Sequence, residues 1–204
     1  MAANKLKFVL ALVIGSVVAG GLLWWQFQRV GEQSSPTITL GGPFELTDHT
    51  GKAVTEATYH GHPVLLYFGY TYCPDVCPSE LQTMAQALDR LGPDGTDIQP
   101  LLITIDPARD TPAHLSDYVS LFHPRLIGLT GTPAQIAAVA RAYRVYFARG
   151  PAPAPVKDGD GGAYTMDHSS FVYLIGPQGQ FLALFSRAMA PERMAEEIRA
   201  KLRR

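Results

Sequence analysis

The chain has 204 residues, of which 47% are hydrophobic and 17% are charged, and its formal net charge at pH 7 is −1. This near-neutral balance argues against a nucleic-acid-binding protein, which would carry a strongly basic face, and it leaves no acidic tail of the kind seen in disordered chains. The length is sufficient for one domain with a sizeable core, and no internal repeat is visible.

The N-terminal segment is predicted to cross a membrane. Residues 8–25 are apolar apart from one serine and three glycines, and a helix of this length spans about 27 Å, enough for a bilayer core. Lys5 and Lys7 precede the segment, and Trp24 and Trp25 end it as an interfacial aromatic pair. The positive-inside rule then predicts a single-pass membrane protein with a cytoplasmic N-terminus. The rest of the chain would lie on the exported side, in the periplasm at a bacterial inner membrane.

A cleaved signal peptide is the alternative for this segment, with Val17–Ala19 as the cleavage site. The apolar run continues beyond that point to Trp25, which favours an uncleaved anchor. The mass of the mature protein would decide between the two. Both alternatives place the domain in an oxidising compartment, where a nearby pair of cysteines tends to form a disulfide.

The first half of the domain is predicted to contain a hairpin, two strands and a helix. Turn residues at Thr50–Gly51 separate two short apolar runs, which predicts a β-hairpin. Residues 63–68 are a continuous apolar run, typical of a central strand buried on both faces. Cysteines follow this strand, and apolar side chains then recur at helical spacing as far as Gly92–Pro93. Residues 98–105 are a second buried strand.

The second half continues the alternation and ends in a hairpin and a helix. Thr111–Pro112 and the capping-box sequence Thr132–Gln135 each predict the start of a helix. Residues 150–162 are rich in proline, glycine and alanine and predict a flexible loop. The remaining elements are a short strand at 126–129, a hairpin at 171–185 and a last helix with an apolar stripe at Met194, Ile198 and Leu202.

Strands that alternate with helices predict an α/β fold. A strand that leads into a two-cysteine turn and then a helix is the thioredoxin-like arrangement. The sequence therefore predicts a thioredoxin-like fold with an N-terminal β-hairpin extension, preceded by one transmembrane helix. The chain divides into an anchor at 1–28, a linker at 29–42 and the domain at 43–204.

The cysteine stretch is the main candidate for chemistry. Cys73 and Cys77 are the only cysteines, with three residues between them. Because proline disfavours helical backbone at the preceding residue, the helix is predicted to begin at Pro78 with Cys77 as its cap. A thiol at a helix N-terminus has a lowered pKa. The pair could form a disulfide or bind a soft metal ion, and a purely stabilising disulfide is disfavoured because so short a loop gains little entropy on closure.

A closed metal site needs a third ligand, and His168 is the candidate. It lies after the flexible loop and before an apolar strand. Judged alone, a histidine at a strand edge is more often structural or solvated than a ligand. If this segment is extended, Met166 lies on the same face as His168 and adds a thioether suited to Cu(I).

Three motifs together resemble the Sco/SenC family. They are Tyr-Cys-Pro-Asp-Val-Cys-Pro at 72–78, Ile-Asp-Pro-Ala-Arg-Asp-Thr-Pro at 105–112 and Asp-His-Ser-Ser at 167–170. Members of this family are thioredoxin-like copper-binding proteins that help to assemble the CuA centre of cytochrome c oxidase. The resemblance implies that Cys73, Cys77 and His168 are copper ligands. Two thiolates and an imidazole suit Cu(I) and can hold Cu(II), although zinc accepts the same set.

Asp106 and Asp167 are expected next to these ligands as supporting groups. Asp106 precedes a proline, so its ordinary role would be to form a turn.

The leading hypothesis from the resemblance is a metallochaperone with no catalytic residues. It would take copper from an upstream donor and pass it to the CuA-bearing subunit of cytochrome c oxidase. The alternative is a thiol–disulfide oxidoreductase that uses Cys73 and Cys77 as a redox-active disulfide, either to reduce the CuA cysteines or in redox signalling. A peroxidase or redox sensor is a third reading, weakened by the lack of an obvious catalytic partner beside Cys73.

Overall fold

The structure is a computed structural model, and it describes residues 15, 20–21, 24–25, 40–150 and 164–203. The chain divides into two compact units, Met1–Ile38 and Thr39–Arg204, and the second carries the fold described below. The predicted membrane segment and linker lie almost entirely outside the described residues. Within the described residues, no helix is long and apolar enough to cross a membrane.

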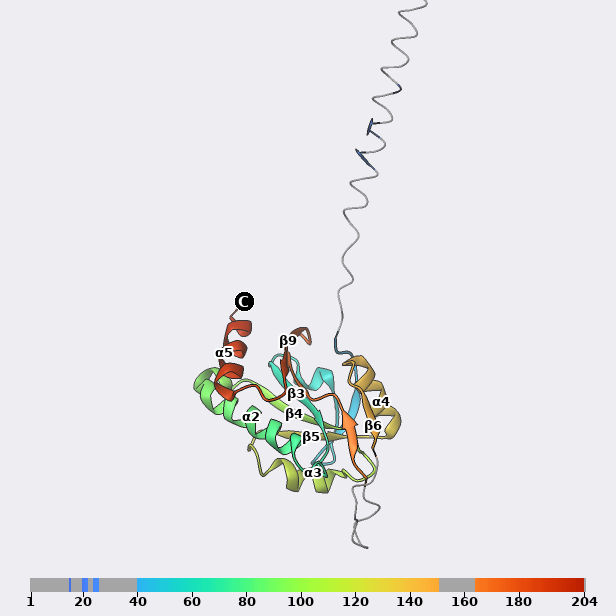
Figure 1. The fold of residues 1–204 in the computed structure, drawn as a ribbon, viewed down its shortest axis with the longest axis vertical. Coiled ribbons are helices and arrows are strands. Elements are labelled where there is room, and N and C mark those ends of the chain that lie inside the picture. Colours follow the sequence, from blue (N-terminus) through green and yellow to red (C-terminus); the bar gives the residue numbers. More distant parts are fainter. Residues whose placement is uncertain (1–14, 16–19, 22–23, 26–39, 151–163, 204) are drawn as a thin grey trace, which may run out of the picture. The chain divides into compact units, whose positions relative to one another are not determined.

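A seven-stranded mixed sheet forms the centre of the domain, with the strand order β2-β1-β5-β4-β3-β8-β9 (Figure 1). The three middle strands, β5, β4 and β3, are parallel, and the flanking strands pair antiparallel to them. The strands are β1 (Glu45–Asp48), β2 (Ala53–Thr55), β3 (Val64–Gly69), β4 (Gln99–Thr104), β5 (Ile127–Thr130), β8 (Phe171–Ile175) and β9 (Phe181–Ser186).

Helices cover both faces of this sheet. On one face, a Cβ built on Gly69 would lie 3.1 Å from the Cys77 sulfur of α2, and one on Gly128 would lie 3.1 Å from Leu115 of α3. On the other face, the ring of Phe68 packs against Tyr143 at the end of α4. The last helix, α5, lies alongside α2 (Figure 1). The helices are α2 (Val76–Leu91), α3 (Pro112–Val119), α4 (Pro133–Ala142) and α5 (Pro191–Leu202), with short 3-10 helices η1 (Glu56–Tyr59) and η2 (Gly92–Gly95).

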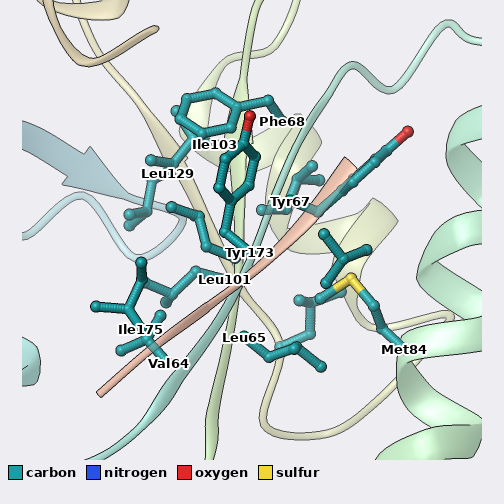
Figure 2. Close-up of a cluster of buried hydrophobic side chains, with 14 of the residues drawn as sticks. Val64, Leu65, Tyr67, Phe68, Met84, Leu101, Ile103, Leu129, Tyr173 and Ile175 are labelled. Atoms are coloured by element: carbon teal, nitrogen blue, oxygen red, sulfur yellow. The ribbon is translucent and has the colours of Figure 1, made fainter. Parts of the chain in front are cut away.

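The core is centred on β3, whose six residues are all buried. Figure 2 shows its side chains packed with those of β4, β5 and β8 and with Met84 of α2. This confirms the prediction of a central strand buried on both faces. It also fixes the carboxyl end of β3 rigidly, and the cysteines follow that end.

Most predicted elements are confirmed. The predicted hairpin is β1–β2, with Gly51 at a φ of 86° in its turn, and it extends the sheet next to β5. Thr111 caps α3, and the predicted capping box of Thr132 and Gln135 begins α4.

A second, two-stranded sheet was missed. Strands β6 (Phe147–Arg149) and β7 (Met166–His168) pair antiparallel, and we call them the β6–β7 arm. Each has only three residues, too few for a recognisable alternation of apolar and polar side chains. Residues 151–163 of the predicted flexible loop lie outside the described residues.

Candidate metal centre

The cysteine loop, Tyr70–Asp75, connects the end of β3 to the start of α2. The prediction that the helix begins at Pro78 was wrong: α2 begins at Val76, so Cys77 lies inside its first turn. A proline is tolerated at the third helical position because the N–H group it lacks would have no helical partner there. The N–H group of Cys77 instead donates to the sulfur of Cys73 at 3.3 Å.

Asp110 attaches the cysteine loop to the neighbouring strand. Its fully buried carboxylate accepts hydrogen bonds from the N–H and hydroxyl groups of Thr71, at 3.1 and 2.6 Å, and from the hydroxyl of Thr104 in β4, at 2.5 Å. Burial raises the pKa of Asp110, and these three bonds oppose that rise. The loop that carries the first cysteine is therefore held by buried polar contacts.

His168 reaches the cysteines from the β6–β7 arm. Its Nε2 lies 3.5 Å from the Cys77 sulfur, and its ring packs edge-on against the rings of Tyr67 and Tyr70. Its Nδ1 lies 3.0 Å from the carbonyl of Ser169. Because a carbonyl only accepts, Nδ1 is the donor, which leaves the Nε2 lone pair of the neutral ring facing the thiols.

The pKa values of the two thiols are shifted in opposite directions. A hydrogen bond from the Cys77 thiol lowers the pKa of Cys73 to about 3, although burial acts against it. The same hydrogen bond and burial raise the pKa of Cys77. Both cysteines are free. The half-buried Cys73 is therefore the thiol that loses its proton more readily, and the buried Cys77 is the one that keeps it.

These groups meet in an open depression of about 320 Å³. Its walls come from the cysteine loop, the β6–β7 arm and the turn after β9, and they comprise Tyr70, Cys73, Pro74, Asp75, Val76, Met166, Asp167, His168, Ser170 and Arg187. A more enclosed cavity of about 230 Å³, lined by Tyr59, Val64 and Ile175 among others, contains no cysteine. The thiol chemistry therefore belongs to the open depression.

The separation of Cys77 and His168 is suited to a shared ion. Metal–sulfur and metal–nitrogen bonds of about 2.3 and 2.0 Å at roughly 110° place the two donor atoms about 3.5 Å apart, and this matches the observed 3.5 Å. No group of three His, Cys, Asp or Glu side chains in the described part of the chain is already arranged to hold a metal ion. The predicted set of Cys73, Cys77 and His168 is brought together, and its role as a ligand set stays a prediction.

The predicted supporting residues have different positions. Asp167 lines the depression, as does Met166, which shares a face with His168 as expected. Asp106 is buried away from the lining and accepts hydrogen bonds from Arg109 and Tyr164.

Sequence reasoning missed Arg109 and Tyr164. Arg109 stands inside the motif at 105–112 and could have been singled out as a cation between two aspartates. Tyr164 lies outside every motif, so no sequence signal identified it.

Comparison with known proteins gives the family. The SCO1/SenC family model matches residues 32–203. The human mitochondrial SCO1 homolog is 47% identical over 166 residues, which cover 80% of this chain and 53% of the relative, so the chain spans about half of that protein's length.

Two solved structures with copper bound are similar over four fifths of the chain. ScoI from Arabidopsis thaliana is 40% identical with a TM-score of 0.73, and the match covers 80% of this chain and 98% of that one. ScoI from Bradyrhizobium japonicum is 45% identical with a TM-score of 0.69, and the match covers 80% and 99%. The predicted thioredoxin-like α/β fold is confirmed by these matches, and the chain belongs to the SCO1/SenC family.

Proposed function

We propose that this protein is a copper metallochaperone that binds copper through Cys73, Cys77 and His168. The observation that carries the proposal is the 3.5 Å approach of His168 Nε2 to the Cys77 sulfur, beside the sulfur of Cys73. It is supported by the copper-bound Sco structures from Arabidopsis and Bradyrhizobium. Two sulfurs and an imidazole are donors that suit Cu(I) and can also hold Cu(II).

Delivery of copper requires that the ion can leave. The depression is open, and Cys73 and His168 both line it, so a partner protein can reach two of the three donors. Cys77 is buried and would be the last of the three ligands to dissociate from copper. Copper would therefore pass to the partner by stepwise exchange of sulfur and nitrogen ligands.

The partners follow from the family. Copper would come from an upstream donor and go to the subunit of cytochrome c oxidase that carries the CuA site. Residues 8–25 would anchor the protein in the bacterial inner membrane, with the domain in the periplasm.

Copper titration of the full chain with X-ray absorption tests the ligand set. The proposal expects two sulfur ligands and one nitrogen ligand per copper ion. The nitrogen should be lost in His168→Ala. In cells, oxidase assembly should fail in both His168→Ala and Cys73→Ser. Full assembly in His168→Ala together with loss in Cys73→Ser would rule out copper transfer, because thiol chemistry needs only the cysteines.

A thiol–disulfide oxidoreductase is the second candidate. It is favoured by the lowered pKa of Cys73 next to the raised pKa of Cys77. The half-buried Cys73 thiolate would attack a partner disulfide, form a mixed disulfide and release one partner thiolate. Cys77, after losing its proton, would then attack Cys73 and release the second partner thiolate. The partner gains two electrons, and Cys73–Cys77 becomes the disulfide.

Alkylation with iodoacetamide tests this reactivity. Because the hydrogen bond from the Cys77 thiol lowers the pKa of Cys73, its thiolate fraction should change little between pH 7 and 9. Its alkylation rate should therefore be nearly constant over this range. A rate that rises tenfold per pH unit up to about pH 8, as for an ordinary thiol, would contradict the assignment.

A further inference from the structure

Tyr164 is held tightly at the start of the segment that carries His168. Its hydroxyl donates to Oδ1 of the buried Asp106 at 2.6 Å. Its ring lies between two guanidinium groups, with the carbon of Arg109 at 3.7 Å and that of Arg149 at 3.6 Å from the ring centroid. Its carbonyl accepts a hydrogen bond from Arg109 Nη1 at 3.1 Å.

Arg109 connects Tyr164 to the rest of the site. The guanidinium forms an ion pair with Asp106 at the end of β4, and it also lies 4.6 Å from the ring centroid of Tyr72 in the cysteine loop. Its Nη2 is buried with no hydrogen-bond partner in the described residues. Contacts with aromatic faces therefore hold this side of the guanidinium. We call Asp106, Arg109, Arg149 and Tyr164 the arginine–tyrosine clamp.

The cysteine loop supplies one further contact with the arm. The hydroxyl of Tyr70 accepts a hydrogen bond from the N–H group of Met166 at 3.1 Å. Tyr70 and the clamp thus hold Met166 and Tyr164 at the start of β7. His168 is paired with Phe147 of β6, and its side chain contacts the Cys77 sulfur, the Ser169 carbonyl and the edges of two tyrosine rings. The start of β7 is therefore one of the places from which the position of His168 is set.

We propose that Tyr164 is a positioning residue for His168. By fixing the start of β7 to Arg109 and Asp106, the clamp keeps Nε2 within reach of the cysteine sulfurs before copper arrives. Copper then meets its third ligand in place and does not have to order the arm. This inference rests on the proposed function, because it concerns the same three ligands.

Two variants of Tyr164 separate the parts of the clamp. Tyr164→Phe keeps the ring between the two arginines and loses the bond to Asp106, whereas Tyr164→Leu loses both. The Cu(II) affinity of the full chain, measured by competition with a chromophoric chelator, should fall about 10- to 100-fold in Tyr164→Leu and less in Tyr164→Phe. Tyr146→Leu is the matched control, because Tyr146 is a highly exposed aromatic residue next to β6, and it should bind copper as the unaltered protein does. Unchanged affinity in both Tyr164 variants would overturn the inference.

A double-mutant cycle shows whether Tyr164 acts through His168. In the His168→Ala background, Tyr164→Leu should have no further effect on copper affinity. An equal loss with and without His168 would mean that Tyr164 merely supports the fold, and the inference would be wrong. If His168→Ala alone left the Cu(II) affinity unchanged, the proposed ligand set would fail first, independently of Tyr164.

Discussion

The two segments that supply the candidate ligands are built differently. The cysteine loop leaves a fully buried central strand, enters a 16-residue helix and is fixed by the buried Asp110. The β6–β7 arm consists of two three-residue strands outside the main sheet, and none of its residues is fully buried. One segment belongs to the core, and the other is attached to it by a few side chains.

This difference suits a protein that must both hold and release an ion. If the proposed ligands are right, the sulfurs on the core side would keep the ion. The imidazole, which the clamp and Tyr70 hold near the sulfurs, would be the ligand that detaches when the arm opens. Local stability in proteins follows buried contacts, and segments that move are those with few of them. Under the proposed function, we therefore expect the cysteine loop to retain copper and the arm to exchange it.

The largest effect is expected from removing a ligand on each side. Cys77→Ser should weaken binding of both copper oxidation states by more than about 100-fold, since even changes that only reorient a ligand cost 10- to 100-fold. His168→Ala should mainly weaken Cu(II), because two thiolates still suit Cu(I) whereas Cu(II) favours nitrogen donors. Chelator competition under reducing and oxidising conditions measures both. Equal losses for Cu(I) in the two variants would contradict the division of roles.

Amide hydrogen exchange compares the two segments directly. Amides of β3 should exchange only on global unfolding, whereas those of β7 should exchange on the order of 100-fold faster through local opening of the arm. Copper should slow exchange in β7 and leave β3 unchanged. Mass spectrometry of peptides covering 64–69 and 166–168 provides the measurement. Equal protection of the two strands without copper would show that the arm is as rigid as the core.

Much of the rigid side was predictable, and little of the arm was. The run at 63–68 and the helical spacing after Pro78 are long, strongly patterned segments, so they identified β3 and α2. The exact start of α2 was not predictable, because it depends on the Cys73 sulfur that accepts the Cys77 N–H group. The motifs gave the candidate ligands and the supporting Asp106, but not Tyr164, which meets Asp106 across 58 residues of sequence.

Loss of Asp110 should loosen the rigid side. In Asp110→Ala, the buried hydroxyl of Thr104 and the partly buried N–H and hydroxyl groups of Thr71 lose their acceptor, which should lower the free energy of unfolding by roughly 2 to 3 kcal/mol. Urea denaturation measures it. Asp117→Ala, an exposed change on α3, is the control and should have no effect. If Asp110→Ala lowered the free energy of unfolding no more than Asp117→Ala does, the cysteine loop would not depend on Asp110.

The pH dependence of the same site has a definite sign. Because burial raises the pKa of Asp110 above its usual 3.8, the folded state binds this proton more tightly than the unfolded chain does. The contribution of Asp110 to stability is therefore complete below pH 3.8 and declines as the pH rises through the raised pKa. The Asp110→Asn variant has no ionisable group at this position. The stability of the unaltered protein relative to Asp110→Asn should thus decrease with rising pH, and an increase would contradict the raised pKa.

The smallest effect is expected at the far end of the arm, where β3 and the arm share one polar contact. The hydroxyl of Tyr67 lies 3.0 Å from that of Ser170, two residues after His168. Tyr67→Phe removes this bond and the interaction of the hydroxyl with the Cys77 thiol but keeps the buried ring. Ser170 can turn to water because it is only half-buried. The free energy of unfolding should fall by less than about 1 kcal/mol, and copper affinity should change less than about fivefold. If Tyr67→Phe instead weakened copper binding as strongly as Tyr164→Leu, His168 would be positioned from both ends of its segment, and the arm would be less free to release copper than its few contacts suggest.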